Sequence, residues 1–436
     1  MIFARTAFFV RHLPVFLLHG FLSLFLPVGH VAWGAAQEEA KQPASSFALQ
    51  DGDVVGFLGD SITAERTYGK LVEQYTLLRH PERNVRFLNL GIGGDTAAGG
   101  LKRLQSDVFE RGVTVLTVAY GINDIGWGTK ADDEHRNLYL SSIREIVRQC
   151  QKNGVRVYIC SAAVTADNPE TSEDSYLQKM CDDGLAIAKS EGGQTIRLQR
   201  YMREVQKRVA NFNQGVAERD RRSLHVPDGI HLNDLGQLAM AFAILDGLGA
   251  DSLVSSAALD ASKSEAIDQQ RCALRDVKLK ENGGSFVRLD ECLPYNNGPF
   301  AGLNYGFVPV SNYNRYGLKV TGLQEGKYLL EVDGSGVGIY SAEQLADGVD
   351  IASATTNGFL PGGPWDAQAN VLKQLTEARS QLGQADGQRK EYFEDSDWTR
   401  SLTKKSDAID DGFYELQRQV ARPRPYRFVL TKQVDE

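Results

Sequence analysis

The sequence predicts an α/β domain of three layers over about residues 45–250, with a parallel β-sheet between two layers of helices. Short apolar runs recur along this segment, and such runs are typical of strands that are buried on both faces of a parallel sheet. Amphipathic stretches separate the runs in strict alternation, which predicts right-handed crossover connections. Ligands of such sheets bind at the carboxyl ends of the strands.

Five strands and six helices are expected in this domain. Each strand coincides with an apolar run, and the runs cover residues 54–58, 85–92, 113–121, 155–162 and 194–198. Helices are expected where apolar side chains recur every three or four positions. These segments cover residues 68–79, 100–109, 138–153, 173–190, 201–213 and 235–248.

A change of pattern predicts a C-terminal extension over residues 256–436. Strand-like segments with turn signals make its first part β-rich over 272–345, and Asp333-Gly334 predicts a hairpin turn. A helical and charged composition follows over 364–421, and a final strand is expected over 426–431, after two prolines. The extension is either an accessory domain or a wrap over the first domain.

Residues 1–36 are typical of a secretory signal peptide. Two arginines precede an apolar stretch over 13–28, and small residues lead to a cleavage site near Ala36. The alternative is an uncleaved membrane anchor, but prolines and a glycine interrupt the stretch and no basic segment follows it. We therefore expect a secreted or periplasmic protein without stable membrane insertion after cleavage.

The net charge argues against nucleic acid as a partner. The whole chain has a formal net charge of -8, and loss of the two arginines within residues 1–36 makes it -10. An acidic protein is repelled by nucleic acid and by anionic membranes, so nonspecific binding to either is not expected.

Histidines and cysteines give little support for a metal site, and no cofactor is expected. No HxH, HExxH or CxxC spacing occurs among them after residue 36. The five cysteines are an odd number for an exported protein, so at least one is free or pairs outside the chain. Cys272 with Cys292 is the favoured disulfide, because strand-like segments flank both.

Ser61 follows the first expected strand, in the stretch FLGDSIT at residues 57–63. A serine just before a helix is commonly its N-cap, since its hydroxyl oxygen accepts a hydrogen bond from a backbone N–H. At the carboxyl end of a buried strand the same side chain points into the binding crevice, where it can act as a nucleophile. These residues alone leave both interpretations open.

A serine nucleophile needs a general base, and the base needs a group that orients it. Asp228 and His231 lie three residues apart across Gly229, so a carboxylate and an imidazole can meet within one turn. The other interpretation of His231 is a surface residue at the start of a helix. His225 and His80 are weaker candidates, because His225 lacks an acidic partner comparable to that of His231 at turn spacing and His80 precedes a proline.

Two further segments follow strands and carry hydrogen-bond donors. Gly94 lies in the stretch NLGIGGDTAAGG at residues 89–100, where glycines let a backbone N–H approach a ligand closely. Asn123 lies in GIND after the third strand and supplies a neutral amide donor. The alternative for the Gly94 stretch is an ordinary glycine-rich turn between a strand and a helix. The alternative for Asn123 is a turn asparagine, which is common next to glycine. Trp127 is expected to line the mouth of the site or to be a core or rim residue.

Four blocks of the chain together resemble the SGNH hydrolases, the superfamily of GDSL esterases and lipases. They are Gly59-Asp60-Ser61-Ile62, Gly94 within GIGGDT, Gly121-Ile122-Asn123-Asp124 and Asp228-Gly229-Ile230-His231. The resemblance implies a flavodoxin-like α/β/α domain over residues 45–255 and ester hydrolysis without a metal. It implies that Ser61 is the nucleophile, His231 the base and Asp228 its orienting carboxylate. It also implies an oxyanion hole made of the N–H groups of Ser61 and Gly94 and the side chain of Asn123.

We therefore expect a secreted serine ester hydrolase that works through an acyl-enzyme. An acidic protein without an obvious apolar lid favours short acyl esters of small molecules or polysaccharides, with acetyl esters of carbohydrates first. The alternatives are a lysophospholipase or lipase that acts on longer acyl chains, and a noncatalytic glycan-binding protein.

Overall fold

The structure is a computed structural model that describes residues 47–296, 302–356 and 362–434. The expected signal peptide over residues 1–36 lies outside these described residues. No helix in the described ranges combines the length and the apolar character needed to cross a membrane.

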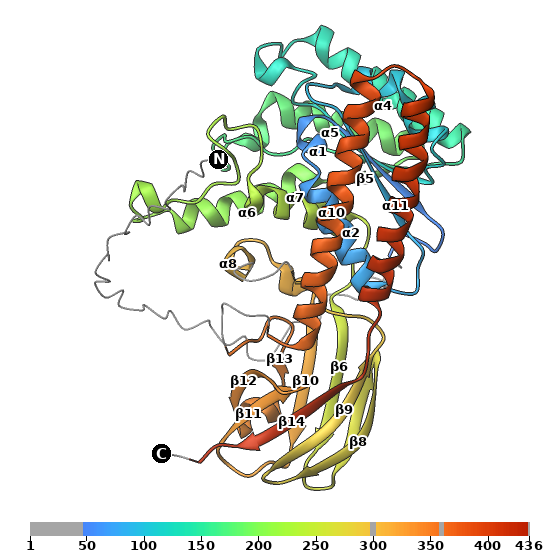
Figure 1. The fold of residues 1–436 in the computed structure, drawn as a ribbon. Helices are drawn as coiled ribbons and strands as arrows, with labels where there is room; N and C mark the ends of the chain where they lie inside the picture. The colour runs from blue at the N-terminus through green and yellow to red at the C-terminus, as the bar shows by residue number, and fades with distance from the viewer. Residues whose placement is uncertain (1–46, 297–301, 357–361, 435–436) are drawn as a thin grey trace, which may run out of the picture. The chain divides into compact units, whose positions relative to one another are not determined.

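A five-stranded parallel sheet forms the centre of the first domain, with strand order β2-β1-β3-β4-β5 (Figure 1). All five expected strands are confirmed. They are β1 (Val54–Gly59), β2 (Arg86–Gly91), β3 (Val115–Ala119), β4 (Arg156–Cys160) and β5 (Gln194–Ile196). Because β1 pairs with both β2 and β3, Gly59 lies opposite Gly91 on one side and Ala119 on the other. The chain segments that leave these three strands therefore begin at the same edge of the sheet.

Helices cover both faces of this sheet, which confirms the three-layer α/β/α fold. They are α1 (Ser61–Ala64), α2 (Thr67–Arg79), α3 (Ala97–Lys102), α4 (Asp133–Lys152), α5 (Tyr176–Ser190), α6 (Leu198–Phe212) and α7 (Asp234–Gly247). The helices α2, α6 and α7 pack together, and α3, α4 and α5 form a second group. The helix expected over 100–109 is instead α3 followed by a π-helical turn, Gln105–Phe109. It begins earlier than expected because the Thr96 side chain caps it by accepting a hydrogen bond from the Gly99 N–H.

The β-rich part of the extension forms two sheets, with strand orders β13-β10-β6-β7 and β12-β11-β14-β9-β8 (Figure 1). Their strands are β6 (Leu253–Asp260), β7 (Glu265–Gln270), β8 (Cys272–Lys280), β9 (Gly283–Asp290), β10 (Arg315–Thr321), β11 (Lys327–Val332), β12 (Ser335–Ser341), β13 (Val349–Asp350) and β14 (Tyr426–Lys432). The expected hairpin is confirmed, since Asp333 and Gly334 have positive φ angles of 49° and 83° between β11 and β12. The sequence did not predict β6 and β7. Small residues dominate β6 and polar residues dominate β7, so neither has the apolar pattern of a strand.

The helical part of the extension consists of α10 (Pro364–Tyr392) and α11 (Asp397–Ala421), which pack against each other (Figure 1). Both also contact α2 of the first domain. Arg379 forms a buried ion pair with Glu73 at 2.7 Å, and the Tyr414 hydroxyl donates to the Val85 carbonyl. The helical part therefore packs on the first domain, and the described residues cluster as one compact unit. The domain boundary at residue 255 stays a prediction.

The expected disulfide between Cys272 and Cys292 is wrong, because all five cysteines are free. In the register of β8 and β9, Cys272 pairs with Asp290, so Cys292 lies two residues beyond its cross-strand position. Each thiol donates instead to a backbone carbonyl of β6, Cys272 to Ser256 at 3.3 Å and Cys292 to Val254 at 3.4 Å.

Candidate active site

Ser61 is the first residue of α1, directly after β1. The N-cap of this short helix is Asp60, whose Oδ1 accepts a hydrogen bond from the Ile62 N–H at 3.0 Å. The capping role that was open for Ser61 therefore belongs to its neighbour. The Ser61 Oγ lies 2.8 Å from the His231 Nε2. Gly91 lets α1 lie close to the end of β2, since a Cβ at this position would come within 2.2 Å of the Ala64 N.

Two hydrogen bonds join Asp228 to His231, and a third joins Asp228 to Ile230 within the same turn. The Asp228 Oδ1 accepts from the N–H groups of Ile230 and His231, at 2.8 and 2.9 Å, and its Oδ2 lies 2.6 Å from the His231 Nδ1. The turn needs Gly229, which has a φ of +73°. Hydrogen bonds from the His231 side chain and from the two N–H groups lower the pKa of Asp228 to about 2.

These contacts define the proton positions on the imidazole. Because an ionised carboxylate can only accept hydrogen bonds, the Nδ1 of His231 carries a proton and donates it to Asp228. In the neutral ring, Nε2 then has a free lone pair and accepts the Ser61 hydroxyl. The arrangement is that of a general base next to a nucleophile.

Gly94 lies in the loop after β2 with a φ of +74°, a conformation that side chains with a Cβ rarely adopt. The loop is fixed to the end of β1, because the Ile92 N–H donates to the Gly59 carbonyl at 3.1 Å. Neither the Gly94 N–H nor the Ser61 N–H donates to another part of the described chain. Both groups can therefore donate to a ligand at this edge of the sheet.

The Asn123 amide is held by two partners. Its Nδ2 donates to the Asp95 carbonyl at 3.1 Å, and its Oδ1 accepts from the indole N–H of Trp127 at 2.8 Å. An indole N–H can only donate, so Trp127 determines which side of the amide carries the oxygen. One N–H of Nδ2 stays available for a ligand.

Trp127 contacts two residues of the site. Its indole ring meets the His231 ring edgewise, with centroids 5.8 Å apart, and is 51% exposed. Its backbone has a φ of 58°, which is uncommon for a bulky side chain. Trp127 is therefore a rim residue that touches both the imidazole and the Asn123 amide.

A supporting network behind the Gly94 loop was missed from the sequence. Arg103 donates to the Leu90 carbonyl at 2.7 Å and to the Asp95 carboxylate at 2.9 Å, and the Tyr120 hydroxyl donates to the same carboxylate at 2.8 Å. This network fixes Asp95, whose carbonyl holds Asn123. The three residues come from three segments, so no local motif signals them.

The other two candidate histidines lie away from Ser61. His225 is buried and donates from Nε2 to the Val164 carbonyl at 2.9 Å, and burial lowers its pKa. His80 stacks on Phe47 with ring centroids 4.6 Å apart, and burial lowers its pKa to about 3. Within the part of the chain that the structure describes, no group of three or more His, Cys, Asp or Glu residues could hold a metal ion.

Asp124, next to Asn123, predicts a pH dependence of stability. Burial raises its pKa to about 7, although its Oδ1 accepts from the Ala97 N–H at 3.0 Å. Since the unfolded pKa is about 3.9, this group stabilises the fold fully below about pH 4, and the contribution is lost as the pH rises through 7. We expect Asp124→Asn to flatten the fall in unfolding free energy between pH 4 and 8, measured by urea titration. An unchanged slope would contradict the assignment to Asp124. In the Asp124→Asn variant, a smaller fall in the unfolding free energy with pH should remain, because burial also raises the pKa of Asp60, to about 6.

Comparison with protein families gives one assignment for this region. Residues 57–239 match the model of the GDSL-like lipase/acylhydrolase family. The matched range includes Ser61, Gly94, Asn123, Asp228 and His231.

Individual relatives are more distant. The chain is 30% identical over 111 residues to the uncharacterized lipoprotein YqeF of Bacillus subtilis (strain 168), a match that covers 24% of this chain and 45% of the relative. The chain thus spans less than half of that protein's length. BT4096, a gut microbial diltiazem-metabolizing enzyme, superposes over 88% of this chain and 98% of its own, with a TM-score of 0.75 and 21% identity. That likeness extends into the C-terminal extension and shows a shared fold. The acetylxylan esterase Axe2 from Geobacillus stearothermophilus covers 46% of this chain and 96% of its own, at 18% identity and a TM-score of 0.38.

Proposed function

We propose that residues 57–239, which match the GDSL-like lipase/acylhydrolase model, act as an esterase domain that hydrolyses carboxylic esters with Ser61, His231 and Asp228 as its catalytic triad. One observation carries the proposal. A path of hydrogen bonds runs from Asp228 through His231, at 2.6 Å, to Ser61, at 2.8 Å. No other side chain is needed to activate the hydroxyl.

The proposed reaction has two halves. The His231 Nε2 takes the proton from Ser61 while the Oγ bonds to the ester carbonyl carbon, and an electron pair moves to the carbonyl oxygen. When this intermediate collapses, the bond to the alcohol oxygen breaks, and the alcohol leaves with the proton from His231. Water then attacks the acyl-enzyme in the same way, releases the acid and restores Ser61. Asp228 stays ionised throughout, since its pKa is about 2, and stabilises the imidazolium.

The negative oxygen of each intermediate needs donors that are already in position. We assign this role to the N–H groups of Ser61 and Gly94 and to the Nδ2 of Asn123. The support is that both backbone groups lack an acceptor within the described chain and that one Asn123 N–H is uncommitted. Trp127 and Asp95 hold the Asn123 amide, so the donor requires no rearrangement when charge develops.

Asn123 and Trp127 are expected to act as one unit. We expect Asn123→Ala to lower kcat by about 10²- to 10³-fold, as loss of one oxyanion donor does elsewhere. Trp127→Phe keeps an aromatic ring but loses the N–H, so we expect a smaller fall in kcat with little change in KM. In the Asn123→Ala background, Trp127→Phe should have no further effect on kcat.

A matched control is Trp398→Phe, which changes another exposed tryptophan on α11 and should leave kcat unchanged. If the effects of Trp127→Phe and Asn123→Ala multiply in the double variant, Trp127 does not act through Asn123.

For the substrate, we propose short acyl groups, acetyl above all, on carbohydrates or other polar alcohols. A long acyl chain is stabilised by about 0.8 kcal/mol for each CH₂ that it buries, so it requires an extended apolar surface. Among the described residues, the exposed large apolar side chains on the loops of the site are Ile92, Trp127 and Val226.

A chain-length series tests this substrate class. Nitrophenyl acetate, butyrate and decanoate would be compared by kcat/KM, together with acetate release from acetylated xylan. We expect kcat/KM to fall at least 10-fold from acetate to decanoate. A higher value for decanoate would favour the lysophospholipase or lipase alternative instead.

We also propose that the protein is exported. The support is the signal-like sequence of residues 1–36, together with a relative that is named a lipoprotein. Fractionation of cells that produce the full chain should find it outside the cytoplasm, and a cytoplasmic pool of full-length protein would contradict this.

A further inference from the structure

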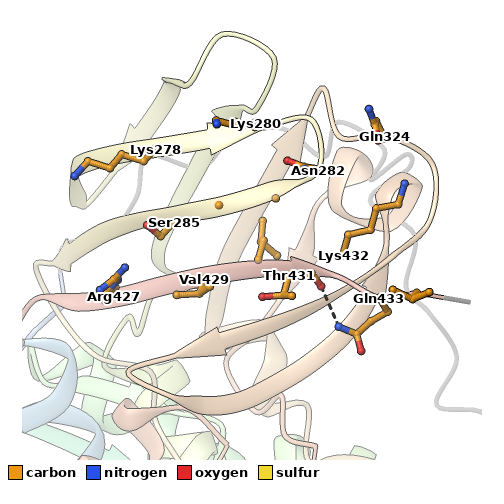
Figure 2. Close-up of a pocket in the computed structure, with 14 residues that line it drawn as sticks. Lys278, Lys280, Asn282, Ser285, Gln324, Arg427, Val429, Thr431, Lys432 and Gln433 are labelled. Atoms are coloured by element: carbon orange, nitrogen blue, oxygen red, sulfur yellow. Dashed lines mark hydrogen bonds between the residues drawn. The ribbon is translucent and has the colours of Figure 1, made fainter.

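One surface of the extension carries positive charge that the proposed reaction does not use. It is a groove of about 880 Å³ on the sheet that contains β8, β9 and β14, far along the chain from Ser61 (Figure 2). Four cations line it, Lys278, Lys280, Arg427 and Lys432, and none of the described residues that line it is a carboxylate. We call this surface the cationic groove. None of the four side chains forms an ion pair within the described residues.

The alternation of the strands places Lys278, Lys280 and Arg427 on one face, whereas Lys432 has the parity of the buried Phe428 and Leu430 and lies at the end of β14. On β14, Tyr426, Phe428 and Leu430 are buried, which leaves Arg427 exposed on the opposite face. On β8, the buried Leu279 separates Lys278 from Lys280, so the two lysines share a face about 7 Å apart.

Two glycines keep the floor of the groove open. Gly283 and Gly284 begin β9 with φ angles of 119° and 137°, which residues with a Cβ rarely adopt. A Cβ on Gly283 would lie 2.2 Å from the Leu430 carbonyl oxygen, and one on Gly284 would lie 2.2 Å from the Lys278 carbonyl oxygen. The absence of side chains at these two positions therefore leaves the floor of the groove open. The cationic side chains surround the backbone of the two glycines.

The charge of the groove is opposite to that of the chain, which is -8 overall. The described acids nearest to the groove residues include Asp333, whose Oδ1 accepts from the Arg427 N–H at 2.9 Å and whose Oδ2 pairs with Arg424. Glu281, which accepts from Gln324 at 3.4 Å, and Glu331, opposite Val429 on β11, are also near. None of the three lines the groove. Four unpaired cations that repel one another are stabilised by a ligand with several negative charges, and more strongly at low ionic strength.

The remaining lining residues indicate which polyanion fits. The amides of Asn282, Gln324 and Gln433 and the hydroxyls of Ser285 and Thr431 can both donate to and accept from sugar hydroxyl groups (Figure 2). The described residues that line the groove include no aromatic side chain, so they offer nucleic-acid bases nothing to stack on. The apolar contribution comes from aliphatic residues such as Val429 and Val434, which is less than a membrane-binding surface requires.

We propose that the cationic groove binds an acidic polysaccharide, whose carboxylates pair with the lysines and arginine and whose hydroxyls pair with the amides. Such binding would hold the hydrolase near a polymer and raise the effective concentration of esters on it. The site is separate from the triad, so binding does not depend on the proposed function being correct.

The test measures binding of polygalacturonate to full-length Ser61→Ala protein by calorimetry at low salt, with dextran as the neutral polymer. Lys278→Glu/Lys280→Glu reverses two charges of the groove. The control is Lys152→Glu/Lys189→Glu, which changes the net charge equally at exposed positions on α4 and α5 that form no ion pair. We expect at least 10-fold weaker binding in the groove variant, unchanged binding in the control, and loss of binding as salt rises.

Equal binding by the two variants, no binding by the parent protein, or equal binding of dextran would overturn the proposal. Tighter groove-dependent binding of duplex DNA or of phosphatidylglycerol vesicles would also overturn it, in favour of another polyanion. The milder Lys278→Ala/Lys280→Ala variant repeats the test if the reversed variant unfolds. With Ser61 intact, hydrolysis of nitrophenyl acetate should be the same in every groove variant, which separates this site from the triad.

Discussion

Replacing Ser61 by alanine is expected to lower kcat for ester hydrolysis by about 10⁴- to 10⁶-fold, the range that follows loss of a triad nucleophile. The physical reason is that no bond to the acyl carbon can form without the Oγ, and His231 then has no hydroxyl to deprotonate. The helix α1 should persist, because Asp60 caps it. Initial rates with nitrophenyl acetate measure the effect, and circular dichroism and the thermal midpoint should match those of the parent protein.

Ser141→Ala serves as the matched control. Ser141 is exposed on α4, and its hydroxyl donates only to the Leu138 carbonyl of the same helix, so its loss should leave kcat unchanged. A folded Ser61→Ala protein that keeps more than a tenth of the parent kcat would contradict the proposal that Ser61 is the nucleophile. The cationic groove would be unaffected by that result.

Replacing Asp290 by alanine is expected to lower the free energy of unfolding by about 3–5 kcal/mol, because it removes one partner of a buried ion pair. Asp290 and Arg288 have fully buried side chains and meet at 2.8 Å. Arg288 also donates to the Gly317 carbonyl at 2.9 Å and to the Ser255 hydroxyl at 2.7 Å. These bonds link β9 to β10 and β6, so both sheets of the extension share one charged network. Without Asp290, the guanidinium stays charged in an apolar interior, since arginine does not lose its proton in proteins.

Urea unfolding followed by circular dichroism measures this loss. The control Glu325→Ala removes an exposed carboxylate between β10 and β11 that forms no ion pair among the described residues, and it should change stability by less than about 0.5 kcal/mol. The double variant Arg288→Met/Asp290→Leu removes both charges and should recover most of the loss. A loss below 1 kcal/mol in Asp290→Ala would show that the pair is dispensable.

The sequence predicted the central sheet because its strands carry their signal locally. An apolar run such as residues 54–58 suits only a strand buried on both faces, whatever its neighbours are. The Asp333-Gly334 turn is equally local, because these two residue types tolerate positive φ angles. By contrast, β6 and β7 are stabilised by pairing with other strands, and their residues carry no strand pattern of their own.

The candidate site shows the same division. The blocks around Ser61, Gly94, Asn123 and His231 were found in the sequence, since each follows a strand or forms a turn. Their hydrogen-bonded contacts depend on parallel strands that end at one edge of the sheet. The capping role of Asp60 is seen only in the structure. The contacts of Trp127 with Asn123 and His231 are likewise seen only there.

By itself, then, the sequence determined which segments become strands and helices and which residues carry the chemistry, because these follow from local periodicity and residue type. The tertiary structure decided register and partnership. It pairs Cys272 with Asp290 instead of Cys292, it fixes Asp95 between Arg103 and Tyr120, and it places four cations around two glycines with no carboxylate among the described lining residues. Strand pairing brings Cys272 opposite Asp290, and the packing of segments that follow β2, α3 and β3 brings Asp95, Arg103 and Tyr120 within hydrogen-bonding distance, which local sequence does not encode.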